Sequence, residues 1–225
     1  MIVVVGSAYD VRARRIVEHW GQRSAMLTQE DLCMPGWRLT IPPRLPLTAV
    51  VGGRIVPSAD IQGILVLRPC IFPEELQNIH RDHRKYVAAE LNAFLLAWLA
   101  AQSCPVLNRP TACCLGGPNW RAEQWTRAAM RLGIPAHTRR SVPNGTTSAD
   151  TEESLELITV GERCFGCNDS SLKESALKLA RAAGVELLSV RFSRDQRRFL
   201  SANAWPSLLD AAVLDAVRER LEAHL

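Results

Sequence analysis

The chain has 225 residues and a mass of 24.9 kDa, enough to bury one large core or two smaller ones. Its content of 47% hydrophobic and 22% charged residues is that of a soluble globular protein. The net charge is only +4 and the arginines are scattered along the sequence, which argues against a nucleic-acid partner.

No apolar run approaches the length of about 18 residues that a membrane-spanning helix needs, so we expect no membrane partner. The sequence begins Met-Ile-Val-Val-Val-Gly, with no positively charged leader before its apolar residues. Such a beginning is not typical of a secretory signal, and we expect a cytoplasmic protein. The 7 cysteines form an odd number, which in this setting indicates reduced thiols rather than a disulfide framework.

The first part of the chain alternates short apolar runs with helical patterns, which predicts an open α/β sheet. The first run ends at Gly6-Ser7 and is followed by a helical pattern that stops at Gly21. Gly52 and Gly53 separate two short apolar runs and predict a β-hairpin with a primed turn. Strands are predicted at 2–5, 24–27, 49–51, 54–56, 63–67 and 105–107, helices at 9–20, 83–101 and 119–132, and irregular proline-rich chain at 35–46.

Residues 143–153, PNGTTSADTEE, have the composition of a linker or mobile loop. A second hairpin, a helix, two strands and a terminal helix are predicted after it, and a short strand before it. These elements are placed at 155–160 with 163–167, 170–183, 186–192, 198–202, 208–225 and 135–140. The predicted domains are therefore an α/β domain at 1–142, a linker at 143–154 and a smaller α+β part at 155–225.

Cys164-Phe165-Gly166-Cys167 is the sharpest local motif. A two-residue spacing suits a zinc site or a redox pair at a helix start. Zinc would need two further ligands, and the adjacent pair Cys113-Cys114 would rarely point the same way. In a strand, Cys164 and Cys167 would face opposite sides of the sheet. Two half-buried thiols are the favoured interpretation, and a thiol redox protein stays open as an alternative.

Other polar groups give weaker indications of a functional site. His80, Asp82 and His83 precede a helix among basic residues, where capping and solvated polarity explain them better than metal binding does. Ser7 follows Gly6 at a strand end, where backbone amides can face a ligand. The second and third glycines of a dinucleotide-binding loop are absent after it.

Two stretches, "RKYVAAELNAFLLAWLAAQSCPVLNRP" and "GPNWRAEQWTRAAMRLGIPAHT", resemble the region ahead of the ATP site in ATP-grasp ligases. The resemblance is to the graspetide macrocyclases and the ribosomal-protein glutamate ligases. In these families a helix marked by Tyr and Glu leads to a "cPVlNrP" turn, and a second helix leads to "lGiPvPrT". The matching residues here are Tyr86, Glu90, Pro105, Asn108, Pro110, Gly133, Ile134, Pro135 and Thr138.

The end of the chain is similar to the same family. "ITVGERCFG" resembles a family strand pair, and "AAGVELLSVRFSRDQRRFLSANAWP" resembles the closing pair of strands, which in the family carries an acid and a Glu-x-Asn ending that bind magnesium. Here Arg191 or a neighbour stands at the first acid, Ser201 at the Glu, and only Asn203 remains. A magnesium ion prefers carboxylates, and an arginine would repel it.

The resemblance also implies a lysine before the second helix and a central nucleotide-binding lobe. The lysine is absent from Gly117-Pro118-Asn119-Trp120-Arg121, and the stretch 141–156 is too short for the lobe. We therefore expect an α/β, ATP-grasp-like protein without that lobe, acting as a non-catalytic accessory or binding protein, with no cofactor. The expected partner is a full-length ligase, a peptide or a small molecule, and a homodimer is the expected assembly.

The alternative is a minimal ATP-dependent carboxylate–amine ligase, completed by oligomerisation and using ATP and magnesium. Arginines such as Arg109, Arg121, Arg139, Arg140 and Arg191 would then hold phosphates. The candidate ligand-binding residues are Gly6, Ser7, Tyr9, Asn108, Arg109, Arg121, Arg191 and Asn203. No catalytic residue and no metal ligand is proposed from the sequence.

Overall fold

The computed structural model describes residues 1–40, 46–136, 153–208 and 210–223. The chain divides into two compact units. The first comprises Met1–Gly117 with Ser207–Leu225, and the second comprises Pro118–Pro206. Each unit has its own sheet and is described by itself.

The first unit contains a four-stranded parallel sheet. Its strands are β1 (Ile2–Val5), β2 (Ser24–Leu27), β5 (Gly63–Val66) and β6 (Val106–Leu107), in the order β2-β1-β5-β6. Every residue of β1, β5 and β6 is buried. Burial on both faces explains why these strands are continuous apolar runs rather than alternating ones. The open α/β sheet predicted from the sequence is confirmed.

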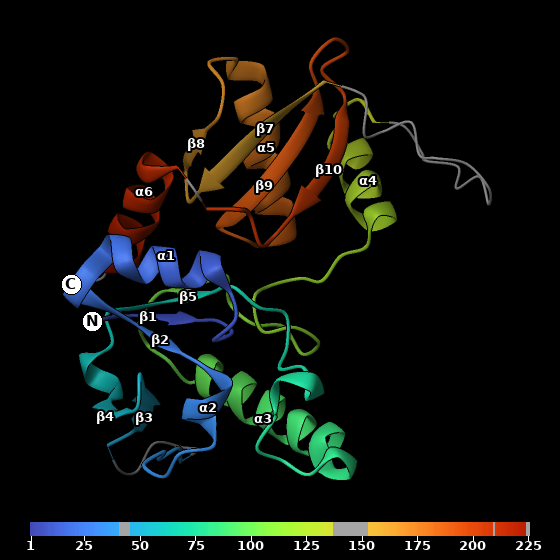
Figure 1. The fold of residues 1–225 in the computed structure, drawn as a ribbon. Helices are drawn as coiled ribbons and strands as arrows, with labels where there is room; N and C mark the ends of the chain where they lie inside the picture. Colours follow the sequence, from blue (N-terminus) through green and yellow to red (C-terminus); the bar gives the residue numbers. More distant parts are fainter. Residues whose placement is uncertain (41–45, 137–152, 209, 224–225) are drawn as a thin grey trace. The chain divides into compact units, whose positions relative to one another are not determined.

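Helices cover both faces of this sheet (Figure 1). Helix α3 (Arg84–Ala100) shares a buried core with one side of β1, through Leu95 and Trp98. Helices α1 (Val11–Trp20) and α6 (Ala211–Glu222) contact β1, and α6 also contacts β5. A Cβ built on Gly63 would lie 2.7 Å from the Cβ of Leu221, so the absence of a side chain at Gly63 lets α6 approach β5 closely.

A β-hairpin and a one-turn helix extend the first unit. Strands β3 (Thr48–Val51) and β4 (Arg54–Pro57) are joined by Gly52 and Gly53, which have φ angles of 58° and 73°. This is the primed turn predicted from the two glycines. Helix α2 (Gln29–Leu32) was not predicted, because a single turn leaves little periodicity to read. Its Asp31 accepts hydrogen bonds from the Gly53 and Thr28 amides at 2.7 and 2.9 Å, which ties the hairpin to the helix.

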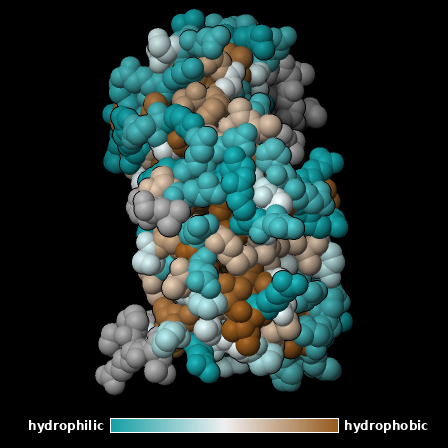
Figure 2. All heavy atoms as spheres, turned by 90° about the vertical axis from the view of Figure 1, so that its left-hand side faces the viewer, coloured by the Kyte–Doolittle hydropathy of each residue, from teal (hydrophilic) through white to brown (hydrophobic). Residues whose placement is uncertain are grey.

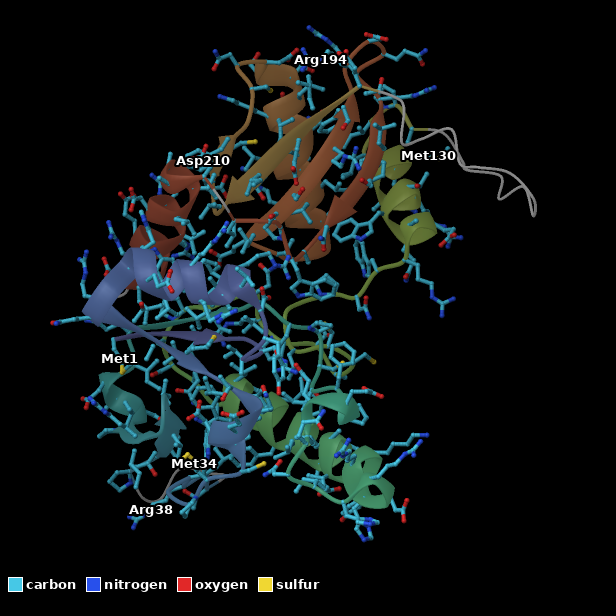
Figure 3. The ribbon with its side chains drawn as sticks, in the orientation of Figure 1. Met1, Met34, Arg38, Met130, Arg194 and Asp210 are labelled. Atoms are coloured by element: carbon cyan, nitrogen blue, oxygen red, sulfur yellow. The ribbon has the colours of Figure 1, made fainter. Side chains whose placement is uncertain are left out.

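The surface of the first unit is not uniformly polar. Figure 2 shows a group of hydrophobic residues within a largely hydrophilic face. Met34 and Ile55 are large hydrophobic residues exposed in this unit, and Met34 is labelled in Figure 3. Short 3-10 turns complete the unit at Gly21–Arg23, Ser58–Asp60, Pro73–Glu75 and Arg81–His83.

The second unit contains a four-stranded antiparallel sheet with helices on one face (Figure 1). The order β10-β9-β7-β8 is formed by β7 (Ser154–Val160), β8 (Arg163–Phe165), β9 (Leu187–Ser193) and β10 (Phe199–Asn203). Helices α4 (Ala122–Arg131) and α5 (Ser170–Ala183) pack against one side of it. Their Trp125 and Leu179 share a core with Val190 and Phe192 of β9.

The division differs from the predicted domains in two places. Helix α4, predicted in the first domain, belongs to the second unit because Trp125 and Ala129 are buried in the core beneath β9. Helix α6, predicted in the last domain, belongs to the first unit because it packs on β1 and β5. Neither packing partner is visible in the local sequence.

Much of the predicted linker, and most of the strand predicted at 135–140, lie outside the described residues. Ala136 makes one isolated bridge to Phe199. Asp169 caps α5, because its side chain accepts hydrogen bonds from the Ser171 and Leu172 amides at the start of the helix. Among the helices that the structure describes, each is too short or too polar to cross a membrane.

Candidate functional site

The first candidate site is the edge of the parallel sheet where its strands end. Gly6 and Ser7 follow β1, Arg68 follows β5 after one further residue, and Asn108 follows β6. Neighbouring parallel strands end at the same edge, so the fold brings these residues together. The strand order reverses between β1 and β5, and ligands of open α/β sheets bind at such a switch point.

Arg68 links the segments at this edge. Arg68 is a buried residue, with an exposed fraction of 5%. Its Nη1 donates to the Gly6 carbonyl at 3.1 Å and its Nε to the Cys70 carbonyl at 2.8 Å. Its Nη2 forms an ion pair with Glu75. A buried arginine needs such partners, because an unpaired charge in the interior is costly.

Glu75 completes this cluster, which we call the Arg68–Glu75 pair. Partial burial acts to raise the pKa of Glu75, but hydrogen bonds from Ser7 and the Phe72 amide, with the Arg68 charge, outweigh burial and lower the pKa. The Ser7 hydroxyl also accepts a hydrogen bond from the Tyr9 amide at 3.3 Å. Ser7 therefore has structural partners on both sides of the switch point.

The remaining predicted residues of this edge have different surroundings. Gly6 allows β1 and α1 to pack, since a Cβ there would lie 2.9 Å from the Cβ of Ala13. Tyr9 is 64% exposed, and Arg109 is also exposed. Asn108 is buried. The structure thus gathers Gly6, Ser7 and Asn108 at one edge and leaves the other two side chains on the surface.

The second candidate site is the face of the antiparallel sheet opposite α4 and α5, which we call the open face. Its defining residues are Ser154 and Glu156 of β7, Ser189 and Arg191 of β9, and Ser201 and Asn203 of β10. Arg191 pairs in register with Glu156 on one side and Ser201 on the other. Ser189 pairs likewise with Asn203. The alternation of strand side chains explains the polar set, because Leu188, Val190 and Phe192 face the helices.

Each charged or amide group of the open face has a specific contact. Arg191 donates from Nε and Nη2 to the Ser154 hydroxyl at 3.2 and 2.7 Å. Ser189 is hydrogen-bonded to the Glu156 carboxylate. The Asn203 Oδ1 accepts from the Trp205 amide at 3.0 Å, and its Nδ2 donates to the Trp205 carbonyl at 2.9 Å.

These residues do not fit a magnesium ion. Magnesium is held by carboxylates and phosphate oxygens. The resemblance assigns the two acids of the metal site to Arg191 or a neighbour and to Ser201. Arg191 and Ser201 stand in register on β9 and β10, and neither side chain is a carboxylate. The remaining amide oxygen, on Asn203, already accepts a backbone hydrogen bond. Glu156 is the carboxylate among these six residues, and the adjacent positive charge opposes a cation beside it.

The other predicted arginines do not join Arg191. Arg121 precedes α4, the helix that packs on the opposite face of the sheet, and its side chain is exposed. Arg139 and Arg140 lie outside the described residues. The phosphate-binding group of arginines is therefore not assembled on the open face by the described part of the second unit.

Cys164 and Cys167 do not face opposite sides, contrary to the sequence prediction. The strand β8 ends at Phe165, and Gly166 turns the chain with a φ angle of 110°. Both thiols therefore pack against the same core. Burial, with a smaller contribution from Cys167, raises the pKa of Cys164 to about 11. A thiol with this pKa is protonated at neutral pH, which disfavours nucleophilic redox chemistry.

Metal binding elsewhere finds no support in the described ranges, where no group of three or more His, Cys, Asp and Glu side chains could hold an ion. His80 and Asp82 form an exposed contact of 3.7 Å between Nδ1 and Oδ2. Their exposure agrees with solvated polar groups. The capping interpretation is wrong, because neither His80 nor His83 makes a side-chain capping hydrogen bond at its helix start.

Sequence reasoning missed Arg68, Glu75, Glu156 and Ser189. Arg68 follows an apolar strand and resembles any surface arginine in the sequence, because its partner is seven residues away across a turn. Glu156 could have been found from the alternation of Leu155, Glu156 and Leu157, which puts it on the face opposite the core.

No protein-family model matches the sequence, and no curated protein matches it either. Solved structures do match. The macrocyclase MdnC from Microcystis aeruginosa MRC, bound with precursor peptide MdnA, superposes with a TM-score of 0.70 over 98% of both chains at 11% identity. The ATP-grasp ligase PsnB, complexed with a minimal precursor, gives 0.66 over 97% of this chain and 98% of its own at 14% identity.

A RiPP-associated ATP-grasp ligase from Chryseobacterium gregarium, in complex with ADP and a leader and core peptide, gives a TM-score of 0.66. Its alignment covers 100% of this chain and 97% of its own, at 9% identity. Identities this low speak for the fold and not for a shared activity. The superpositions, together with the parallel and antiparallel sheets described above, show that the chain has the ATP-grasp ligase fold.

Proposed function

We propose that this chain is a non-catalytic, ATP-grasp-like binding or accessory protein. The observation that carries the proposal is the composition of the open face. Arg191 or a neighbour and Ser201 stand where the family resemblance places magnesium-binding acids, and the Asn203 amide is hydrogen-bonded to Trp205. A phosphoryl-transfer site needs a metal cation beside the phosphates, and the Arg191 guanidinium opposes a cation on this face of the sheet.

The length of the chain between the two identified segments supports the same conclusion. Between Ala136 and Glu153 there are only residues 137–152, whereas the resemblance implies a lobe with a lysine strand, a glycine-rich loop and a hinge. We propose that this lobe is missing. The structural alignments span nearly all of both chains and therefore do not support a missing lobe. The support for it comes from the sequence.

A peptide is the proposed ligand class. The solved structures that share the fold include complexes with precursor peptides. We propose that this chain keeps a peptide-binding role without the ligation step, alone or together with a separate full-length ligase. The homodimer expected from the sequence stays a prediction, which light scattering on the purified protein would test.

The test is a calorimetric titration of the purified protein with ATP, with and without magnesium, followed by an assay for ADP formation. We expect no magnesium-dependent binding and no turnover with an added peptide acceptor. Micromolar, magnesium-dependent binding together with ADP formation would establish the alternative, a minimal carboxylate–amine ligase. PsnB has also been solved with Mg and ADP, which makes it a suitable positive control.

A matched variant tests the reason given for the lost metal site. The double substitution Arg191→Asp and Ser201→Glu places two carboxylates in register on β9 and β10, two residues from Asn203 along β10. We expect this variant to bind Mn²⁺, detected by electron paramagnetic resonance, and the wild-type chain not to bind it. Equal Mn²⁺ binding by both chains would contradict the argument.

A further inference from the structure

We propose that Cys70 and Cys114 form a dithiol site, which a peroxide oxidises to a disulfide that ties the loop after β5 to the loop after β6. This inference goes beyond the proposed function and does not rest on it. All seven cysteines are free in the structure, so the disulfide is a modification of the reduced protein. Both cysteines belong to the first unit.

A backbone hydrogen bond joins the two segments that carry these cysteines. The amide of Leu115 donates to the carbonyl of Pro69 at 2.9 Å. Cys70 is the residue after Pro69, and Cys114 is the residue before Leu115. Each cysteine is therefore only one residue, or about 3.8 Å along the chain, from the same contact. The two are neighbours in the fold although α3 and β6 lie between them in the sequence.

Other hydrogen bonds hold both segments in place. The Cys70 carbonyl accepts from Arg68 Nε at 2.8 Å. The amide of Thr111 donates to the Cys114 carbonyl at 2.9 Å, and the Cys114 amide donates to the Thr111 carbonyl at 3.2 Å. A disulfide needs Cα atoms about 4.4–6.8 Å apart, and a backbone contact next to both cysteines favours this spacing. A bond between the sulfurs would also fix the segment that holds Arg68.

The thiols of this site influence one another electrostatically. Burial is the main cause that raises the pKa of Cys114, and the negative charges of Cys70 and Cys113 raise this pKa further. The pKa of Cys70 is also raised, chiefly by burial, although the charge of Arg68 acts to lower it. Both thiols are protonated at neutral pH, and we expect their oxidation to become faster as the pH rises, because the thiolate is the reactive form.

Exposure assigns a role to each thiol. Cys70 is half-buried and accessible to a small oxidant, whereas Cys114 is buried. The Cys70 sulfur attacks one oxygen of hydrogen peroxide, the O–O bond breaks, and a sulfenic acid and water form. The Cys114 sulfur then attacks the sulfenic sulfur, the S–O bond breaks, and a second water leaves. Two thiols thus lose two electrons and two protons, and one peroxide is reduced to two waters.

The pair Cys164 and Cys167 in the second unit is arranged differently. The Cys164 thiol donates to the Phe165 carbonyl at 3.9 Å, and the Cys167 thiol donates to the Asp169 carbonyl at 4.0 Å. The two thiols are therefore directed to different acceptors. We expect this pair to stay reduced under conditions that oxidise Cys70 and Cys114, and it serves as an internal control.

The experiment is oxidation of the purified full chain with hydrogen peroxide at mildly alkaline pH. The remaining thiols are blocked with N-ethylmaleimide, and tryptic peptides are analysed by mass spectrometry without reduction. Because Cys104, Cys113 and Cys114 share one tryptic peptide, a variant with Cys104→Ser and Cys113→Ser is oxidised beside the wild type. We expect a cross-link to Cys70 in both chains, which in the variant involves Cys114 alone.

Single variants test each role. Cys70→Ser should abolish the cross-link, and Cys114→Ala should leave Cys70 as a sulfenic acid that dimedone labels. Absence of any cross-link in the wild type would overturn the proposal. A disulfide between Cys70 and Cys113, or between Cys164 and Cys167 alone, would overturn it as well.

Thermal unfolding shows whether the bond suits the folded chain. The disulfide closes a loop that contains α3 and β6, and such a closure lowers the entropy of the unfolded chain. We expect oxidation to raise the midpoint of the variant with Cys104→Ser and Cys113→Ser by about 5 °C or more, and dithiothreitol to reverse the rise. An unchanged or lower midpoint would mean that the bond distorts the fold, and would overturn the proposal.

Discussion

Arg68 and Glu75 carry opposite charges at the edge of the parallel sheet. Each charge compensates the other for the hydration that it loses on burial. Replacing Glu75 by Gln leaves the Arg68 guanidinium buried without a counter-charge. We expect Glu75→Gln to lower the free energy of unfolding by about 3 kcal/mol, measured by urea denaturation. Glu74→Gln, at the exposed neighbouring glutamate, is the control and should change little. Equal stability of the two variants would refute a structural role for the pair.

The same carboxylate predicts a dependence of stability on pH. Because the folded protein lowers the pKa of Glu75 from its usual 4.5, the unfolded chain takes up the proton first as the pH falls. The contribution of Glu75 is therefore complete above 4.5 and disappears as the pH passes below the folded value. Urea unfolding at decreasing pH should show the difference between wild type and Glu75→Gln shrinking. A constant difference would be inconsistent with this linkage.

The pKa of the Cys164 thiol is shifted in the opposite direction to that of Glu75, and this shift predicts low reactivity. Its pKa of about 11 means that the reactive thiolate is scarce at neutral pH. We expect iodoacetamide at neutral pH to alkylate the exposed Cys113 well before Cys164, as followed by peptide mass spectrometry. Replacing both Cys164 and Cys167 by Ser should leave ligand binding unchanged. Rapid alkylation of Cys164 would revive a redox role.

At the scale of the elements, the turn after β8 depends on one glycine. A Cβ built on Gly166 would lie 2.2 Å from the Glu156 carbonyl oxygen, and the φ angle of 110° is itself unfavourable for other residues. Gly133 also has a positive φ, of 71°, but open space around it. Substituting each glycine by alanine therefore distinguishes two effects: backbone strain alone at Gly133, and strain together with steric overlap at Gly166.

We therefore expect Gly133→Ala to cost about 1 kcal/mol of unfolding free energy, the penalty of a positive φ alone. Gly166→Ala should cost at least about 2 kcal/mol more, because β7 must move to accept the methyl group. Thermal unfolding of the two variants measures the difference. Similar midpoints would mean that the turn relaxes without moving β7.

The elements themselves were largely predictable, because burial leaves a periodic trace in the sequence. The strands of both sheets, the hairpin at Gly52-Gly53 and the helix around Leu95 appear where apolar periodicity places them. The candidate sites were only partly predictable. Gly6 and Ser7 follow a recognisable strand, but Arg68 and Glu75 become a pair through a turn whose path no local pattern records. The register that sets Arg191 beside Glu156 and Ser201 likewise depends on long-range strand pairing.

At the scale of the whole molecule, the first unit depends on a helix from the other end of the chain. Val213, Val217 and Leu221 of α6 are buried, and α6 contacts β1 and β5. Deleting residues 207–225 should strip hydrogen-exchange protection from the β1 and β5 amides. Protection of β7 and β9 should persist, because their core comes from the second unit.

Two single substitutions keep this test interpretable should the deletion variant aggregate. Leu221→Ala removes a buried side chain and should weaken the same amides by about 2–5 kcal/mol. Ala212→Ser, on the exposed side of α6, should leave them unchanged. Unaltered protection of β1 and β5 in both Leu221→Ala and the deletion would show that α6 is dispensable to the sheet.

The second unit is one uninterrupted stretch of chain, Pro118–Pro206, placed between two pieces of the first. On the ribosome, β1, β2, β5 and β6 therefore emerge long before the helix that covers one of their faces. The second unit is translated later, but all the residues of its core have been made before α6, which the first unit needs, is made. The first unit is therefore made first and completes its fold last. Until α6 emerges, the apolar sheet of this unit is uncovered on one face, and such a surface is one that chaperones bind.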